Sequence, residues 1–256
     1  MIDIQQVSVQ YGQHQVLHNV SLQLADNEML CVLGPNGSGK STLLKTILNV
    51  VPFSGDVLIN GQSVKKYSRK TLAKEVALLS QHQHVQAGYS VKDIVMMGCF
   101  ARQKTGLFTS YKKEDVAYVE NILADLGLWE LKDQEVLKLS GGQKQLVFLA
   151  KTMAQAPNLL LLDEPSNHLD IKYQLQMIAF LKKWQVQHQS QIIGVFHDVN
   201  LALNLSDNLL MMKQGEIVVK GNFSEIGTQN NFQTLYDTEL VEYYLASLEK
   251  WQQLLK

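Results

Sequence analysis

The sequence predicts an α/β fold built around an open sheet of short buried strands. Three apolar runs, at residues 29–33, 159–162 and 192–196, have the length of buried strands. The first two are followed by apolar side chains at helical spacing, so strands and helices alternate along the chain. Sheets of this kind bind ligands outside the carboxyl ends of their strands. We therefore expect functional groups to gather at one edge of the core sheet.

The composition excludes several classes of protein. The chain has 256 residues, 46% hydrophobic and 18% charged, as expected for one large globular domain or two unequal ones. The net charge of −1 gives no electrostatic support for a nucleic-acid partner. Two cysteines argue against a disulfide framework and fit a reducing compartment. The sequence shows no signal-peptide pattern and no apolar run near the roughly 18 residues of a membrane span, so we expect a soluble chain.

The N-terminal part reads as strands. Between residues 2 and 24, apolar and polar side chains alternate, which predicts an antiparallel β meander. Residues 56–59 predict another strand, and Asn60-Gly61 directly after it is a strong hairpin signal. A further apolar strand is predicted at 76–81, and it ends in Gln81.

Two other parts of the chain read as helical. From about 84 to 138, apolar side chains recur at helical spacing with little strand pattern, which predicts a largely helical insertion. The tail from 239 to 256 has the same spacing. We expect the tail helix to pack on its own domain, with contact to a second chain as the alternative.

The stretch GPNGSGKS at 34–41 predicts a site for the phosphates of ATP. It fits the pattern G-x-x-x-x-G-K-[ST], in which glycines turn backbone N–H groups towards phosphate oxygens, Lys40 reaches the β- and γ-phosphates and Ser41 ligates Mg²⁺. A strand precedes it and a helix follows, so the phosphates would lie at a helix N-terminus, which favours anions. The residues expected to contact the nucleotide are Gly34, Asn36, Gly37, Ser38, Gly39, Lys40, Ser41 and Thr42.

Polar residues follow the other two apolar runs, and we expect them to meet the same nucleotide. Asp163 and Glu164 follow the second run, and His197 follows the third. Asp163 would hold Mg²⁺ through water, as P-loop ATPases use an acid at a strand end. Glu164 would polarise an attacking water, and His197 would hydrogen-bond the γ-phosphate or that water. The alternative for the two acids is an exposed strand end that turns at Pro165. For His197 it is a structural histidine.

A second anion site is predicted at 139–143, LSGGQ. Ser140 is a good N-cap, and the apolar side chains of 146, 149, 150 and 153 give the helix behind it a buried face. The serine hydroxyl and the glycine N–H groups at this helix N-terminus would bind an anion. The residues of this site are Ser140, Gly141, Gly142 and Gln143.

LSGGQ, placed between the phosphate-binding loop and a strand that ends in Asp163-Glu164, resembles the ATP-binding subunits of ABC transporters, over about residues 2–221. The resemblance implies a P-loop NTPase of ABC type, with a RecA-like mixed-sheet core, an antiparallel β subdomain and a helical subdomain. It places the ATPase domain at 1–221, the helical subdomain at about 84–155 and a helical C-terminal extension at 222–256.

The resemblance also implies a role for single residues. It implies that adenine stacks on Tyr11 and that Gln81 contacts Mg²⁺ and links the nucleotide to the helical subdomain. It also implies that Glu164 is the catalytic glutamate and that His197 is the switch histidine, which senses the terminal phosphate. Residues 166–170 correspond to the loop that crosses to a second cassette. The chain departs from the family after LSGGQ, where Lys144, Leu146 and Lys151 stand at positions at which arginine is frequent. Lysine keeps the charge but loses the bidentate fork, so contacts there would be weaker.

The resemblance implies partners as well. Two cassettes would form a head-to-tail homodimer in which LSGGQ of one copy closes over ATP held by the other, with two such sites. With no membrane span of its own, the chain would dock on separate permease subunits at the cytoplasmic face of the cell membrane, served indirectly by a periplasmic or lipoprotein binding protein.

Residues 89–98 and 197–202 resemble the importers of iron–siderophore complexes, haem and cobalamin. Import of zinc, manganese, molybdate or another solute stays open, because these segments do not touch cargo. Two further readings stay open: a soluble ABC ATPase of DNA repair or translation, and a regulatory cassette that hydrolyses little ATP. Two cassettes in one chain or a coiled-coil insertion would favour a soluble factor, and the sequence has neither.

Overall fold

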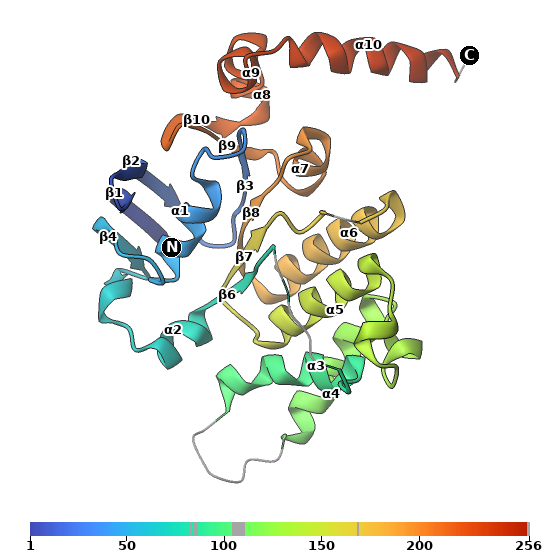
Figure 1. Ribbon diagram of the computed structural model, residues 1–256. Coiled ribbons are helices and arrows are strands. Elements are labelled where there is room, and N and C mark those ends of the chain that lie inside the picture. The colour runs from blue at the N-terminus through green and yellow to red at the C-terminus, as the bar shows by residue number, and fades with distance from the viewer. Residues whose placement is uncertain (82, 84–86, 104–110, 168, 255–256) are drawn as a thin grey trace.

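A computed structural model describes residues 1–81, 83, 87–103, 111–167 and 169–254 of the chain (Figure 1). One of its two sheets is antiparallel and has four strands in the order β2-β1-β4-β5. These strands are β1 (Ile2–Tyr11), β2 (His14–Leu24), β4 (Ser54–Ile59) and β5 (Gln62–Ser63). The predicted hairpin is confirmed, because Asn60 and Gly61 both have positive φ, as a two-residue hairpin turn requires.

The second sheet is mixed and forms the core. Its six strands follow the order β10-β9-β3-β8-β7-β6, and all neighbours are parallel except β10, which is antiparallel to β9. The bounds are β3 (Met29–Leu33), β6 (Val76–Leu79), β7 (Leu159–Asp163), β8 (Gln191–Val195), β9 (Asn208–Lys213) and β10 (Glu216–Asn222). The α/β class and the mixed sheet agree with the sequence prediction. Because β3, β7 and β8 are parallel neighbours, their polar carboxyl ends lie at one edge.

The core sheet is covered on both faces. On one face, Leu43, Leu44 and Ile47 of α1 (Lys40–Ile47) share a buried cluster with side chains of the antiparallel sheet. On the other face, alternate side chains of the same strands pack against helices α5 (Gly141–Ala154), α6 (Ile171–His188) and α7 (Val199–Leu205). The helix that follows the phosphate-binding loop is therefore held between two sheets.

In the described residues, the part between β6 and β7 consists of helices and loops, with one isolated β-bridge between Ser90 and Glu135. It contains α3 (Val91–Met97), α4 (Lys113–Asp125) and α5, with 3₁₀ turns at Gly98–Arg102, Trp129–Leu131 and Val136–Lys138. Before β6 lie the 3₁₀ turn Val64–Lys66 and α2 (Arg69–Glu75). Residues 82, 84–86 and 104–110 lie outside the described residues, and the boundaries predicted at about 84–155 stay a prediction.

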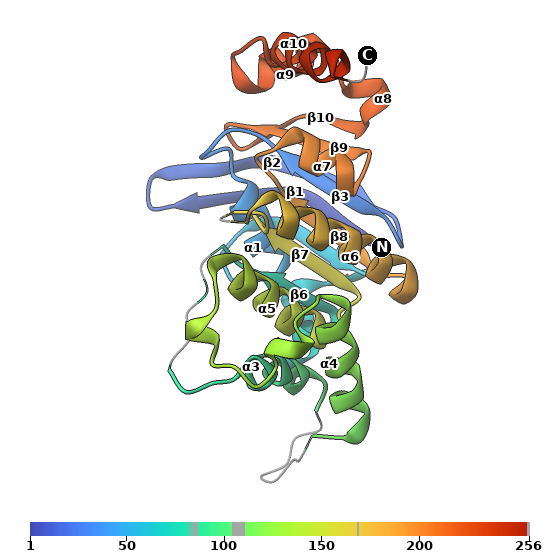
Figure 2. The same ribbon diagram turned by 90° about the vertical axis from the view of Figure 1, so that its right-hand side faces the viewer.

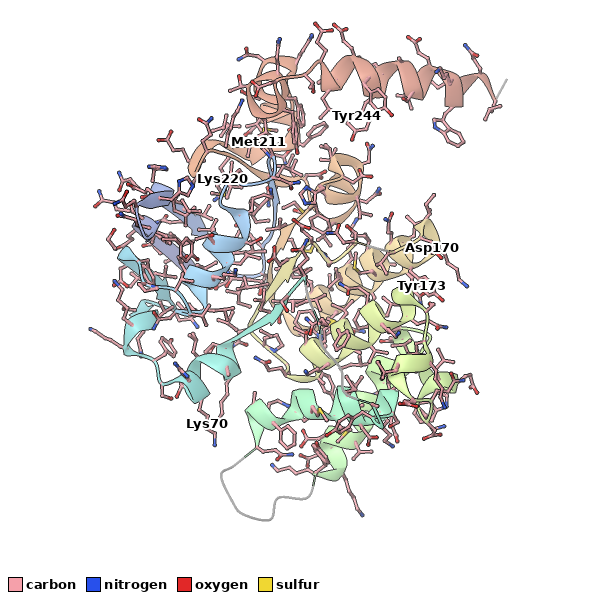
Figure 3. All side chains as sticks on the ribbon, viewed as in Figure 1. Lys70, Asp170, Tyr173, Met211, Lys220 and Tyr244 are labelled. Atoms are coloured by element: carbon pink, nitrogen blue, oxygen red, sulfur yellow. The ribbon has the colours of Figure 1, made fainter. Side chains whose placement is uncertain are left out.

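The chain ends in α8 (Phe223–Ile226), α9 (Gln229–Tyr236) and α10 (Leu240–Gln253). Figure 2, turned by 90°, shows α10 at the opposite end of the molecule from α3 and α4. Tyr244, labelled in Figure 3 below α10, packs against the core together with Leu240 and Val241, whereas Leu248 and Trp251 are exposed. The tail helix thus packs on its own domain only through its first half.

The apolar side chains of α6 are not all buried. Ile171 and Leu175 are exposed, whereas Ile178 and Leu181, which share their helical spacing, are buried. The buried stripe instead runs through Met177, Leu181 and Trp184, which lie at i, i+4 and i+7. Each helix of the described residues is too short or too polar to span a membrane.

Candidate nucleotide-binding and catalytic site

The phosphate-binding loop joins β3 to α1. Gly34, Gly37 and Gly39 have φ values of 154°, 79° and 95°. A Cβ atom on Gly34 would lie 2.1 Å from the backbone oxygen of Met212, and one on Gly39 would lie 2.6 Å from the Leu17 side chain. Only glycine combines these backbone angles with so close an approach. The loop is thereby seated against β9 and β2, and it leads into the start of α1, where the first N–H groups of a helix have no partner within the helix.

Lys40 is folded into this loop. Its Nζ donates hydrogen bonds of 2.8 Å to the backbone oxygens of Gly34 and Pro35, and 5% of the residue is exposed. Burial lowers the pKa of Lys40, while the negative charges of Glu164 and Asp163 oppose this effect. The loop carbonyls therefore hold a positive charge at the place where phosphate oxygens are expected.

Ser41 and Asp163 form the pair predicted to hold Mg²⁺. The Ser41 hydroxyl donates a 2.7 Å hydrogen bond to Oδ1 of Asp163, which is buried. Burial raises the pKa of Asp163 above its ordinary value, and the hydrogen bond from Ser41 partly offsets this. Mg²⁺ prefers oxygen ligands such as hydroxyls and carboxylates. The negative charge of the buried Asp163 is only partly compensated by its neighbours, so the donor set fits the ion.

Asp163→Asn is expected to raise the melting temperature of the ligand-free protein at pH 7 and to reduce Mg²⁺-dependent ATP hydrolysis. A carboxyl whose folded pKa is raised stabilises the fold fully at low pH, and this contribution is lost as pH rises through the folded pKa. Asparagine has the same shape and no charge to bury. Thermal unfolding without ligand, from pH 8 down to about 4, the ordinary pKa of an aspartate, checks this: the advantage of the variant should shrink as the pH falls through the raised pKa of Asp163. A variant that melts below the wild type at pH 7 contradicts it.

Glu164 lies at the centre of the polar groups. It directly follows the last residue of β7 with φ of 53°, and its N–H donates to the Val195 backbone oxygen at 3.2 Å. Its Oε2 accepts hydrogen bonds from Gln81 Nε2 at 2.7 Å and Asn167 Nδ2 at 2.5 Å. Its Oε1 lies 2.6 Å from Nε2 of His197. The structure thus joins the ends of β6, β7 and β8 through one carboxylate.

These contacts refine two sequence predictions. Gln81 was predicted to contact Mg²⁺, and among the described residues its side chain donates to Glu164. Asn167 was not singled out, although Glu-Pro-Ser-Asn has proline at the second position of a turn, which could have revealed the contact. His168, within the predicted loop 166–170, lies outside the described residues. The roles assigned to these residues stay predictions.

The LSGGQ segment forms a capping box at the start of α5. Ser140 Oγ accepts from the Gln143 N–H at 3.3 Å, and Gln143 Oε1 accepts from the Ser140 N–H at 3.0 Å. A Cβ on Gly142 would lie 2.7 Å from the ring of Tyr173, which Figure 3 labels with Asp170 at the start of α6. The cap leaves Gly141 open, because no atom of the described residues lies within 4 Å of its Cβ position.

Tyr11, the residue predicted to stack on adenine, ends β1. Its residue surface is 45% exposed, so part of its ring is open to solvent. Gly215, in the turn between β9 and β10, receives a hydrogen bond from His18 and donates one to the Ser38 backbone oxygen. Strand β2, which pairs with β1, is thereby tied to the phosphate-binding loop.

Comparisons with known proteins identify the family of the chain. The sequence pattern of the ABC transporter family matches residues 17–167. The ferric enterobactin transport ATP-binding protein FepC of Escherichia coli K12 is 33% identical, over 91% of this chain and 85% of FepC. The iron(3+)-hydroxamate import ATP-binding protein FhuC of Bacillus subtilis 168 is 31% identical, over 94% of this chain and 90% of FhuC.

A solved structure agrees as well. It belongs to an ABC transporter described as metal-chelate type, in an inward-facing conformation, and superposes with a TM-score of 0.78 at 26% identity. The match covers 92% of this chain and 88% of that one. From its loop, its fold and these relatives, the chain belongs to the ABC transporter family.

Proposed function

We propose that this chain binds and hydrolyses ATP to energise the import of an iron–siderophore complex, or of haem or cobalamin, through a separate membrane permease. The observation that carries the proposal is the group formed by Lys40, Ser41, Asp163 and Glu164 at one edge of the sheet. The import of siderophore complexes by FepC and FhuC supports the solute class. Zinc, manganese or molybdate is the alternative cargo.

The proposed reaction is attack of water on the γ-phosphorus of ATP. The new bond forms from the water oxygen to phosphorus, and the bond to the bridging oxygen of the β-phosphate breaks, with its electrons leaving on ADP. Glu164 orients the water and accepts its proton, and His197 holds the carboxylate from the other side. Lys40 and the loop N–H groups stabilise the charge on the phosphate oxygens. Mg²⁺, held by Ser41 and Asp163, would neutralise part of that charge.

We further propose that the site is shared between two copies of the chain. Ser140 and the N–H groups at the start of α5 are a second set of phosphate donors, which would close over ATP held on the loop of the other copy. A head-to-tail pair related by a two-fold axis has two such sites. Binding of ATP would close the pair, and release of phosphate would let it open and move the permease, to which the chain would dock at the cytoplasmic face of the membrane.

An uptake experiment tests the solute class. Cells of the source organism that lack this chain are supplied with wild-type protein or with Lys40→Ala, and uptake of a ⁵⁵Fe-loaded siderophore is measured. We expect uptake with the wild type alone. Full uptake in cells without the chain contradicts the iron–siderophore assignment. Haem, cobalamin, zinc, manganese and molybdate are measured in the same cells, and a defect in one of these instead would reassign the cargo.

A further inference from the structure

We infer that Asn167 is a positioning residue that orients the carboxylate of Glu164 through its side-chain amide. The inference rests on the proposed function, because it takes Glu164 as the group that orients water. It gives Asn167 a role that was not predicted for residues 166–170, and it assigns the residue to one oxygen, Oε2 of Glu164.

A turn fixes Asn167 relative to Glu164. The backbone N–H of Asn167 donates to the backbone oxygen of Glu164 at 3.2 Å, which closes a four-residue turn with Pro165 at its second position. Within that turn, Asn167 Nδ2 donates to Glu164 Oε2 at 2.5 Å. The amide and the carboxylate are therefore held together within one four-residue turn. The backbone bond does not depend on the side chain, so the turn can persist when the side chain is changed.

The carboxylate of Glu164 needs such a restraint. The terminal torsion of a glutamate side chain is broad and two-fold, so it does not by itself set the plane of the carboxylate. A carboxylate has about four lone-pair sites, and here three of them meet Gln81, Asn167 and His197. One site remains for a water. Without the amide of Asn167, Oε2 keeps a single donor, and the plane of the carboxylate can turn away from that water.

Asn167 also lies next to a surface that is expected to contact a second copy of the chain. It begins the loop that leads to α6, whose N-cap Asp170 accepts a hydrogen bond from the Tyr173 N–H at 3.1 Å. This is the loop expected to face the second copy. The hydrogen bond of Asn167 to Glu164 would therefore link that predicted contact surface to the carboxylate.

Two substitutions in the full-length chain test the inference. We expect Asn167→Ala to lower kcat for MgATP by roughly tenfold, since misplacement of a catalytic group costs up to about 10²-fold, and to leave KM within about twofold. Asn167→Asp should be worse than alanine, because a carboxylate in place of the amide repels Glu164. A residue that only shaped the turn would give the opposite order, because aspartate has the shape of asparagine and is equally suited to turns.

A matched control is available at the other end of β7. Asn158 Nδ2 donates to Oε2 of Glu75 at 2.7 Å, which is the same kind of amide–carboxylate bond on the surface. Asn158→Ala should keep the wild-type kcat. Wild-type kcat in Asn167→Ala, or a higher kcat in Asn167→Asp than in Asn167→Ala, would overturn the inference.

A double substitution separates this inference from the function on which it rests. In a Glu164→Ala background, Asn167→Ala should change the residual rate by less than about twofold, because its target is gone. An equal tenfold loss in that background would overturn the inference. If Glu164→Ala itself hydrolyses ATP at the wild-type rate, the role proposed for Glu164 fails. If Glu164→Ala is inactive and Asn167→Ala is fully active, only the role of Asn167 fails.

Discussion

Glu164→Gln is expected to lower kcat for ATP hydrolysis by roughly 10³-fold while ATP binding is retained, because a positioned general base contributes about 10²- to 10⁴-fold. Glutamine keeps the shape of the side chain but has one acceptor oxygen instead of two. Its amide oxygen can still accept the hydrogen bonds that Gln81 and Asn167 donate, but the NH₂ group in place of the other oxygen cannot take a proton from water. Phosphate release and titration with MgATP measure the two quantities separately.

The matched control for this prediction is Glu75→Gln. Glu75 is a surface carboxylate that accepts a hydrogen bond from an asparagine, as Glu164 does, and it lies away from the phosphate-binding loop. The control should hydrolyse ATP at the wild-type rate. Turnover by Glu164→Gln within about tenfold of the wild type would remove Glu164 from the role of base, since even the low end of the expected range is larger.

Lys40→Ala is expected to weaken ATP binding by roughly 10- to 100-fold, since a hydrogen bond to a charged group contributes about 1.5–3 kcal/mol. The substitution removes the ammonium that Gly34 and Pro35 hold inside the loop, so the phosphate oxygens lose a buried positive charge. Titration of the variant with ATP measures the loss directly.

The control for Lys40→Ala is Lys183→Ala. Lys183 is exposed and pairs with Asp125 at 2.7 Å, away from the loop. Its removal should leave ATP affinity unchanged. Undiminished affinity in Lys40→Ala would show that the loop does not bind the phosphates as proposed.

The sequence predicted the parts of the fold that depend on neighbouring residues. The Gly34–Thr42 loop after a buried strand, the Asn60-Gly61 hairpin and the N-cap of Ser140 each follow from the conformation that a few adjacent residues can adopt. These local features were enough to predict where on the chain a nucleotide site would lie.

The pairing of strands could not be predicted in the same way. Cys31 pairs with Gly194, and Val76 pairs with Leu159, so the neighbours in the core sheet come from distant parts of the chain. Periodicity describes only which side of a strand or helix is buried. The order of the six strands therefore required the structure.

The candidate site was also predictable only in part. The polar residues that follow β7 and β8 were recognisable in the sequence, and their convergence on one edge of the sheet followed from the general behaviour of parallel sheets. That Gln81 and Asn167 donate to the same oxygen of Glu164 depends on side-chain directions at the ends of separate segments, which spacing along the chain does not determine. The exposed faces of α6 and α10 are likewise decided by what packs against them, not by their periodicity.

The most direct test of a site shared by two copies is the mass of Glu164→Gln in solution with MgATP, measured by light scattering. One chain has a mass of 28.9 kDa. We expect twice this mass with saturating MgATP, because slow hydrolysis would keep ATP between the loop of one copy and Ser140 of the other, and the mass of one chain with MgADP. The mass of one chain at saturating MgATP, with ATP bound, would contradict the account.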